Sequence, residues 1–228
     1  MTHPGARREV LVTGGGRGIG RAIALRFADS GARVFVNFFI DREAAEKTAR
    51  DVELRGGVAH LVQADLKEPG EITRMAGEVA RVAGRLDVLV NNAASGVLRG
   101  PLALSPKQWD WVMNTNARPL LLCAQEAACL MSAGGRIVAL TSLGSERVIP
   151  GYAAVGVSKA ALEALTRYLA VELAPRGITV NAVSAGAVAT DVWRAFPEGE
   201  ALLEAARART PAGRLTSAKE VAEVVFFL

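Results

Sequence analysis

The segment VLVTGGGRGIG, residues Val10 to Gly20, joins a short apolar run to a cluster of glycines. An amphipathic stretch from Ile19 to Asp29 follows it, and Gly31 stands where a helix commonly ends. The pattern predicts a strand, a tight turn and a helix. Glycines allow such a turn and let backbone N–H groups approach a pyrophosphate at the helix N-terminus. The segment therefore favours dinucleotide binding over a merely flexible loop.

Strand and helix patterns alternate along the rest of the chain, with no Pro/Ser-rich linker and no repeat. The strands are continuously apolar, which is typical of a parallel sheet covered on both faces. We expect one domain, residues 1–228, with a three-layer, doubly wound α/β fold of the Rossmann type, and one further strand beyond Leu228. The expected strands are Val10–Val12, Arg33–Phe38, Val58–Gln63, Leu86–Val90, Arg136–Leu140 and Ile178–Val183, and the expected helices are Ile19–Asp29, Arg42–Arg55, Pro69–Val82, Pro106–Met131 and Tyr152–Leu173.

Composition excludes several classes of protein. Of 228 residues, 50% are hydrophobic and 22% charged, so the chain can bury a sizeable core. It has no signal-peptide core and no apolar run of membrane-spanning length, so we expect a soluble cytoplasmic protein. Two histidines, His3 and His60, nearly rule out a Ser-His-Asp triad or a His-rich metal site. Cys123 and Cys129 form no CxxC pair and are expected to be free thiols. The net charge of +4 comes from scattered Lys and Arg, which gives little support for nucleic-acid binding.

The end of the second expected strand bears on the choice of cofactor. An acidic residue there would bind the adenosine 2′-hydroxyl and repel a 2′-phosphate. This strand ends Val36-Asn37-Phe38-Phe39, and Asn37 occupies the position of the acid. Arg17 in the glycine turn adds positive charge nearby. We therefore expect NADPH, although Asp41, a few residues further on, favours the opposite choice.

Lys159 lies in an otherwise apolar helical stretch, where a snorkelling surface lysine is the simplest interpretation. Tyr152 stands seven residues before it. Because two helical turns take about 7.2 residues, both side chains should project from one stripe of the helix. A nearby ammonium stabilises a phenolate, so we expect Lys159 to lower the pKa of Tyr152 and make its phenol a useful acid.

Several motifs together resemble the short-chain dehydrogenase/reductase family over the whole chain. They are Thr13-Gly14-x-x-x-Gly18-Ile19-Gly20, Asn91-Asn92-Ala93, Asn116 and the pair Ser158-Lys159. The family places its catalytic tyrosine four residues before the lysine, where this chain has Val155, which has no proton to give. The spacing Tyr152-x6-Lys159 is instead similar to the enoyl-acyl-carrier-protein reductases of the superfamily. Residues 91–99, 155–168 and 210–214 resemble the FabL-type members, which use NADPH.

The resemblance implies reduction of trans-2-enoyl thioesters, carried on acyl carrier protein or CoA, as in fatty-acid elongation. Hydride from the nicotinamide would reach the β-carbon, and Tyr152 would stabilise the enolate that forms on the thioester oxygen. The resemblance also implies a homotetramer, in which the helices Pro106–Met131 and Tyr152–Leu173 pair between subunits. No nucleic-acid or membrane partner is expected.

The resemblance assigns roles to single positions. For some of these positions a purely structural role is the alternative to a functional one. Asp65 could cap its turn, Asn116 could kink its helix and Thr190 could cap a helix, and Trp193 and Phe196 could pack in the core. Residues 191–209 are expected to form a lid. The catalytic residues implied are Tyr152, Lys159, Ser142 and Asn116; the cofactor-binding residues are Gly14, Gly16, Arg17, Gly18, Ile19, Asn37, Asp65, Leu66, Asn91, Ala93, Lys159, Gly186, Val188 and Thr190; and the substrate-contacting residues are Leu98, Leu143, Tyr152, Trp193 and Phe196.

Two other functions stay open. One is reduction of a specialised enoyl-CoA or of a ketone. The other is a non-catalytic NADP-binding regulator, since the usual tyrosine position holds Val155. The pairing of Tyr152 with Lys159 argues against the regulator, because a sensor would not need it.

Overall fold

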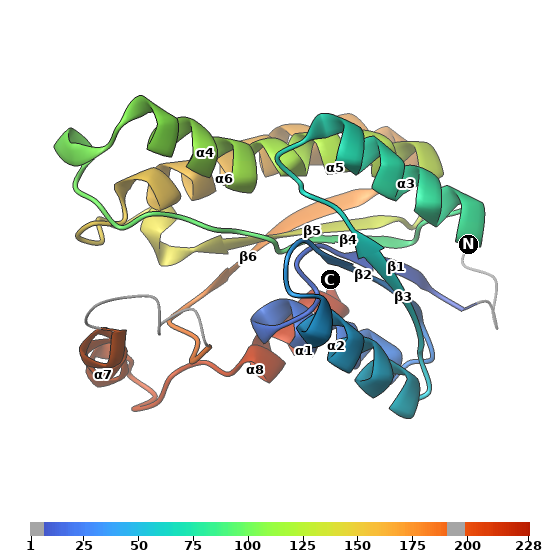
Figure 1. Ribbon diagram of the computed structural model, residues 1–228, viewed down its shortest axis with the longest axis horizontal. Helices are drawn as coiled ribbons and strands as arrows, with labels where there is room; N and C mark the ends of the chain where they lie inside the picture. The colour runs from blue at the N-terminus through green and yellow to red at the C-terminus, as the bar shows by residue number, and fades with distance from the viewer. Residues whose placement is uncertain (1–6, 191–198) are drawn as a thin grey trace.

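The computed structural model describes residues 7–190 and 199–228. Its strands form one parallel sheet of order β3-β2-β1-β4-β5-β6. Helices α3, α4, α5 and α6 cover one face, and α1, α2 and α8 cover the other (Figure 1). This confirms the predicted doubly wound Rossmann fold. The strands are β1 Glu9–Val12, β2 Arg33–Phe38, β3 Val58–Gln63, β4 Val88–Asn91, β5 Arg136–Ser142 and β6 Thr179–Ala185, and the helices are α1 Gly18–Ala28, α2 Arg42–Leu54, α3 Pro69–Ala83, α4 Pro106–Asn116, α5 Arg118–Leu130, α6 Ala153–Leu173, α7 Gly199–Arg209 and α8 Ala218–Phe227.

Strand β1 illustrates why the sheet is covered on both faces. Leu11 packs into the core beneath α3 and α5, whereas Val10 and Val12 pack into the core beneath α1 and α8. Successive strand side chains point to opposite faces, so an unbroken apolar run supplies both cores. Burial of each such side chain stabilises the fold by about 1.5–3 kcal/mol.

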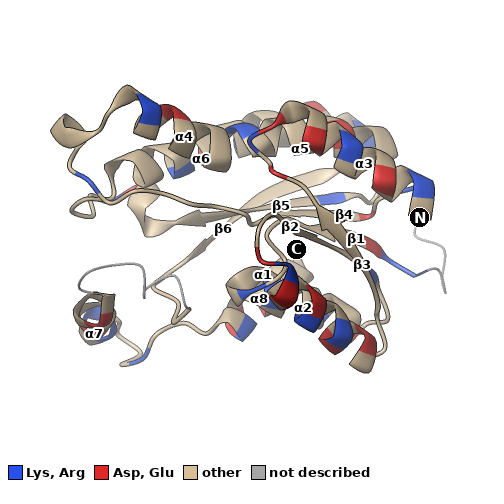
Figure 2. Cartoon of the chain, viewed as in Figure 1, with Lys and Arg blue, Asp and Glu red and all other residues tan. Residues whose placement is uncertain are grey.

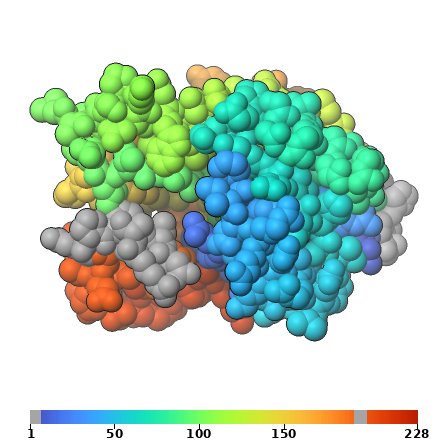
Figure 3. Space-filling view, viewed as in Figure 1, coloured from blue at the N-terminus to red at the C-terminus, as the bar shows by residue number. Residues whose placement is uncertain are grey.

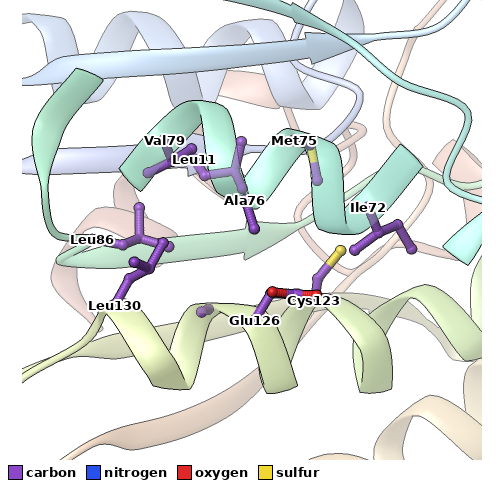
Figure 4. A pocket seen from close by; sticks show the side chains of 10 residues that line it. Leu11, Ile72, Met75, Ala76, Val79, Leu86, Cys123, Glu126 and Leu130 are labelled. Atoms are coloured by element: carbon purple, nitrogen blue, oxygen red, sulfur yellow. The ribbon is translucent and has the colours of Figure 1, made fainter. Parts of the chain in front are cut away.

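The core between α3 and α5 is densely packed. A cavity of only about 10 Å³ remains there, lined by Leu11, Met75 and Cys123 among others (Figure 4). A space of this size holds no more than a water molecule. Burial raises the pKa of the Cys123 thiol to about 12, so it is inert. Both cysteines are free thiols, as predicted.

The single long helix predicted over Pro106–Met131 is wrong: the chain forms α4 and α5 with a break at Ala117. Pro119 has no N–H to donate to a carbonyl of the preceding turn, and its ring opposes a continuous helix. The amide of Asn116 bonds outside the helix, to Ser95 and Ser158, which stabilises the break. The two helices therefore take slightly different paths across the sheet.

Two strands and one helix differ from prediction at the end where the functional residues lie. Strands β5 and β6 extend two residues further, to Ser142 and Ala185. Helix α6 begins at Ala153, so Tyr152 is its N-cap, with φ −95° and ψ 13°. The position of the Tyr152 side chain therefore depends on the turn before α6 as well as on the helix.

Charged residues of both signs are frequent along α2 and α3 (Figure 2). Arg42 pairs with Glu46 on α2, and Arg74 with Glu71 on α3. Such exposed pairs contribute little stability, because water and salt screen the attraction. The mixture of signs on these helices agrees with the scattered Lys and Arg of the sequence.

Candidate functional site

The glycine turn after β1 is shaped to approach a ligand with its backbone. Gly14 and Gly18 have φ of +60° and +55°, which side-chain-bearing residues rarely adopt. A Cβ on Gly20 would lie 2.3 Å from the Gly14 carbonyl oxygen, so only glycine fits there. Arg17 is the N-cap of α1, and no side chain caps that helix. The first N–H groups of α1 thus face the carboxyl edge of the sheet and suit an anion.

Thr13 ties the glycine turn to the residues after β4. Its hydroxyl donates to the Val90 carbonyl (3.2 Å) and accepts from the N–H groups of Asn92 (2.9 Å) and Ala93 (3.1 Å). The Asn92 amide donates to the Thr13 and Gly14 carbonyls in return. Thr13 is fully buried, so these bonds hold two turns in fixed register.

Asn37 has a structural role that the sequence did not reveal. It is 2% exposed, its Oδ1 accepts from the Gly14 N–H (3.1 Å), and its Nδ2 lies 3.3 Å from the carbonyls of Val62 and Ala64. These contacts occupy both ends of the amide. Asn37 therefore braces the glycine turn against β3, and its contact with a cofactor stays a prediction. The ring of Phe39, which sequence reasoning passed over, is 47% exposed at the same edge.

Asp65 follows β3 at the edge of an open groove of about 700 Å³ that Phe39 and Glu68 also line. Its carboxylate accepts from the Lys67 N–H (3.0 Å) and pairs with the Lys67 ammonium (3.1 Å). This is the turn-capping role given as the alternative. The side chain of Leu66 is buried in the core, so only its backbone can reach a ligand.

Asn91 and Ser142 end β4 and β5 side by side in the strand order. Both carry buried polar atoms without a hydrogen-bond partner within residues 7–190 and 199–228: both amide atoms of Asn91, and the Ser142 hydroxyl. Buried polar atoms ordinarily have partners, because leaving them unpaired costs about 1–3 kcal/mol. Unpaired groups at the carboxyl edge of two neighbouring strands are what a polar ligand site requires.

Lys159 reaches this edge from α6. It is 5% exposed, and its ammonium donates to the Leu140 carbonyl on β5 (2.6 Å). Burial lowers the pKa of Lys159 to about 8, because the charged form loses its hydration. The side chain is thus a buried cation, and the snorkelling interpretation is wrong.

Asn116 joins α4 to the residues after β4 and to α6. It bonds to the backbone N–H and carbonyl of Ser95 (2.9 Å each) and to the Ser158 hydroxyl (3.0 Å). Ser158 directly precedes Lys159, so Asn116 fixes α6 relative to the β4–α4 segment, residues 92–105. This agrees with a supporting role rather than contact with the reacting atoms.

Tyr152 lies between two glycines. A Cβ on Gly144 would come within 2.6 Å of its ring, and a Cβ on Gly156 within 3.7 Å. Burial raises the pKa of Tyr152, and the nearby Ser142 hydroxyl partly opposes this, although no hydrogen bond of ordinary geometry joins the two. The predicted lowering of this pKa by the Lys159 ammonium is therefore wrong: desolvation of the ring raises the pKa, Lys159 has no part in the shift, and the phenol stays protonated at neutral pH.

Glu163 is a polar residue of this region that sequence reasoning missed. It lies one turn after Lys159 on α6, and its Oε1 is 2.6 Å from the hydroxyls of both Thr141 and Ser145. Thr141 directly precedes Ser142, and Ser145 is the last residue of the 3-10 turn η2, Leu143–Ser145. A spacing of four residues after Lys159 was the available signal, since it places both side chains on one face of α6.

The loop after β6 reaches back to the glycine turn. A Cβ on Gly18 would lie 3.7 Å from Thr190 Cγ2, so the structure brings these two predicted residues together. A Cβ on Gly186 would lie 3.7 Å from the Thr216 hydroxyl, and Val188 forms an isolated parallel bridge with the same threonine. The described residues just after β6, 186–190, therefore run past Thr216 to the glycine turn.

The predicted substrate residues are only partly visible. Leu98 and Leu143 are 38% and 45% exposed, on the two segments that flank Tyr152. Trp193 and Phe196 lie outside the described residues. The β4–α4 segment, with the 3-10 turn η1 (Pro101–Ala103), projects at the end of the molecule where α7 also lies (Figures 1 and 3).

The described part of the chain has neither a helix long and apolar enough to cross a membrane nor a group of three His, Cys, Asp or Glu side chains suited to a metal ion.

Residues 14–228 match a protein family described as Enoyl-(Acyl carrier protein) reductase. The chain is 44% identical over 225 residues to 1-cyclohexenylcarbonyl-CoA reductase of Streptomyces collinus, covering 97% of this chain and 80% of that protein. It is 37% identical over 225 residues to the 3-oxoacyl-[acyl-carrier-protein] reductase FabG of Staphylococcus aureus, covering 97% and 90%. A short-chain dehydrogenase of Burkholderia cenocepacia, solved with NADP, superposes with a TM-score of 0.89 at 36% identity, over 96% of this chain and 89% of that one.

Proposed function

Because this chain belongs to the short-chain dehydrogenase/reductase superfamily, we propose that it reduces the carbon–carbon double bond of enoyl thioesters with NADPH. The observation that carries the proposal is the protonated phenol of Tyr152 beside Ser142, in a chain whose usual tyrosine position holds buried Val155. The Streptomyces relative is named for reduction of an enoyl-CoA, which supports the same reaction class.

The described residues fit the cofactor. The uncapped N-terminus of α1 and the glycine turn suit the pyrophosphate, and Arg17, which has no ion-pair partner among the described residues, suits a 2′-phosphate. In this proposal Asp65 would contact the adenine and Lys159 the nicotinamide ribose. When bound, the reduced nicotinamide supplies the hydride for the β-carbon of the substrate.

Tyr152 stabilises the charge that develops on the thioester oxygen. Its raised pKa keeps the proton on the phenol, so the hydroxyl would donate a hydrogen bond to that oxygen. The enolate would then take up a solvent proton at the α-carbon, which completes the reduction of the double bond. The Lys159 ammonium adds a positive charge inside the cleft, where a low dielectric strengthens it. Val155 offers no proton, and this disfavours direct reduction of a ketone.

Acyl carrier protein, as in fatty-acid elongation by FabL-type enzymes, is the carrier we propose, and CoA is the alternative that the Streptomyces relative supports. We also propose a homotetramer. Exposed apolar side chains on α5 and α6, namely Leu121, Val157 and Val171, support pairing of these helices between subunits. Light scattering after size exclusion measures the assembly.

The test compares NADPH oxidation with crotonyl-CoA, crotonyl carrier protein, 1-cyclohexenylcarbonyl-CoA and acetoacetyl-CoA. We expect turnover of the enoyl thioesters and a drop in kcat of about 100-fold in Tyr152→Phe, the usual effect of removing one oxyanion donor. Tyr168→Phe is the matched control, because Tyr168 is 77% exposed on the same helix. Reduction of acetoacetyl-CoA alone, or full activity of Tyr152→Phe, would refute the proposal. NADPH binding without any oxidation would favour the regulator.

A further inference from the structure

The β4–α4 segment crosses the start of α6 and is attached to it at three places. Ser95 bonds through its backbone to Asn116, whose amide also reaches α6 at Ser158. Gly96 rests on Val155. The Arg99 N–H donates to the Gly151 carbonyl (2.7 Å), and Arg99 forms a parallel bridge with Tyr152. The attachment through Arg99 therefore connects the segment to Tyr152 itself and to the residue before it.

Gly96 makes the tightest of these contacts. A Cβ at this position would lie 2.1 Å from Val155 Cγ2, closer than real side-chain contacts ever come. Gly96 is not one of the glycines with positive φ, so its backbone conformation would accept another residue. The neighbouring valine, and not the backbone, is what requires glycine at position 96.

Val155 cannot yield to a larger neighbour. It is 6% exposed and packs in a cluster with Val112 and Ala154. Its β-branched side chain has a single strongly preferred rotamer in a helix. Its carbonyl accepts from the Ser158 hydroxyl (2.7 Å), which fixes the first turns of α6. A side chain at position 96 would therefore lift the β4–α4 segment rather than displace α6.

Such a displacement would reach Tyr152. The Arg99–Gly151 bond lies three residues along the segment from Gly96, and Gly151 directly precedes Tyr152. On its other side the Tyr152 ring packs closely on Gly144, where a Cβ would come within 2.6 Å of it, so the ring cannot move freely in that direction. A misplacement of the order of 1 Å near reacting atoms can cost about 100-fold in rate.

We propose that Gly96 and Val155 form a matched pair that positions Tyr152: the missing side chain at 96 sets the height of the β4–α4 segment over α6, and so the place of the phenol. Gly96 touches none of the reacting groups and is a positioning residue. The inference rests on the proposed role of Tyr152 in the reduction of enoyl thioesters. Val155, at the usual tyrosine position of the family, thus has a packing role of its own, because its branched side chain makes the contact with Gly96.

The experiment is a double-mutant cycle of Gly96→Ala, Val155→Ala and the double variant, with crotonyl-CoA and NADPH. We expect Gly96→Ala to lower kcat about 10- to 100-fold while KM for NADPH stays within twofold, because the glycine turn is untouched. The double variant should recover at least tenfold over Gly96→Ala, since the shorter side chain at 155 frees the space. Gly100→Ala is the matched control: it lies in the same segment with nothing within 4 Å of its Cβ and φ −61°, and should keep full activity.

Full kcat in Gly96→Ala, or a double variant no better than Gly96→Ala, would overturn the inference. If Gly96→Ala does not fold, the double variant is compared with Val155→Ala, and a large further loss would overturn it equally. The unfolding free energies of the same proteins measure the Gly96–Val155 coupling without turnover. Lack of any enoyl reduction by the wild type would refute the proposed function, whereas additive stabilities would refute the packing step on its own.

Discussion

The buried ammonium of Lys159 makes a quantitative prediction about pH. Its pKa is 10.5 when exposed and about 8 in the fold, because burial penalises the charged form. Below pH 8 both folded and unfolded chains hold the proton, and the penalty is fully present. Between pH 8 and 10.5 the unfolded chain binds more protons than the folded one, so stability rises with pH. At 1.36 kcal/mol per pKa unit, the rise from pH 7 to pH 10 is about 2–3 kcal/mol.

The measurement is urea denaturation of the cofactor-free protein at pH 7, 8, 9 and 10, followed by tryptophan fluorescence. Lys159→Met removes the titrating group and keeps the apolar stem, so the wild-type free energy of unfolding should rise relative to this variant as the pH increases. Lys107→Met, at an exposed position on α4, is the control and should run parallel to the wild type. If the wild type and Lys159→Met differ by the same amount at pH 7 and pH 10, the ammonium is not desolvated and the reasoning fails.

Two further predictions concern the glycine turn. Thr13→Ala leaves the N–H groups of Asn92 and Ala93 without their acceptor, whereas the Val90 carbonyl still accepts from the backbone N–H of residue 13, and we expect a loss of about 2–3 kcal/mol in the free energy of unfolding, measured in urea; Thr13→Ser keeps the hydroxyl and should restore most of it. Arg17→Ala removes a cation suited to a 2′-phosphate, so we expect KM for NADPH to rise about tenfold with KM for NADH unchanged, and an equal rise for both would contradict the assigned contact.

Helix α4 shows where sequence patterns stop being sufficient. The apolar and polar residues from Pro106 to Met131 read as one long helix, whereas the chain breaks at Ala117, where the Asn116 side chain bonds to Ser95 and Ser158, which lie far away in the sequence. Pro119 was the visible local signal. By contrast, β1 and the glycine turn follow from adjacent residues alone, and these were predicted correctly.

The sign of the pKa shift at Tyr152 is a second such case. Spacing places Tyr152 and Lys159 two helical turns apart, which suggests a lowered phenol pKa. Burial of the ring between Gly144 and Gly156 instead raises this pKa, and Lys159 has no part in the shift. Desolvation depends on every segment that surrounds a side chain, so helical spacing cannot give its magnitude.

The sequence by itself determined the sheet, its helical cover, the glycine turn and the spacing of Tyr152 and Lys159, because these depend on the periodicity and conformational preferences of neighbouring residues. Only the tertiary structure decided that Asn37 braces the turn, that Thr190 lies over Gly18 and that Gly96 rests on Val155. Each of those is a contact between segments far apart along the chain, and packing alone selects them from the many pairs that the sequence would allow.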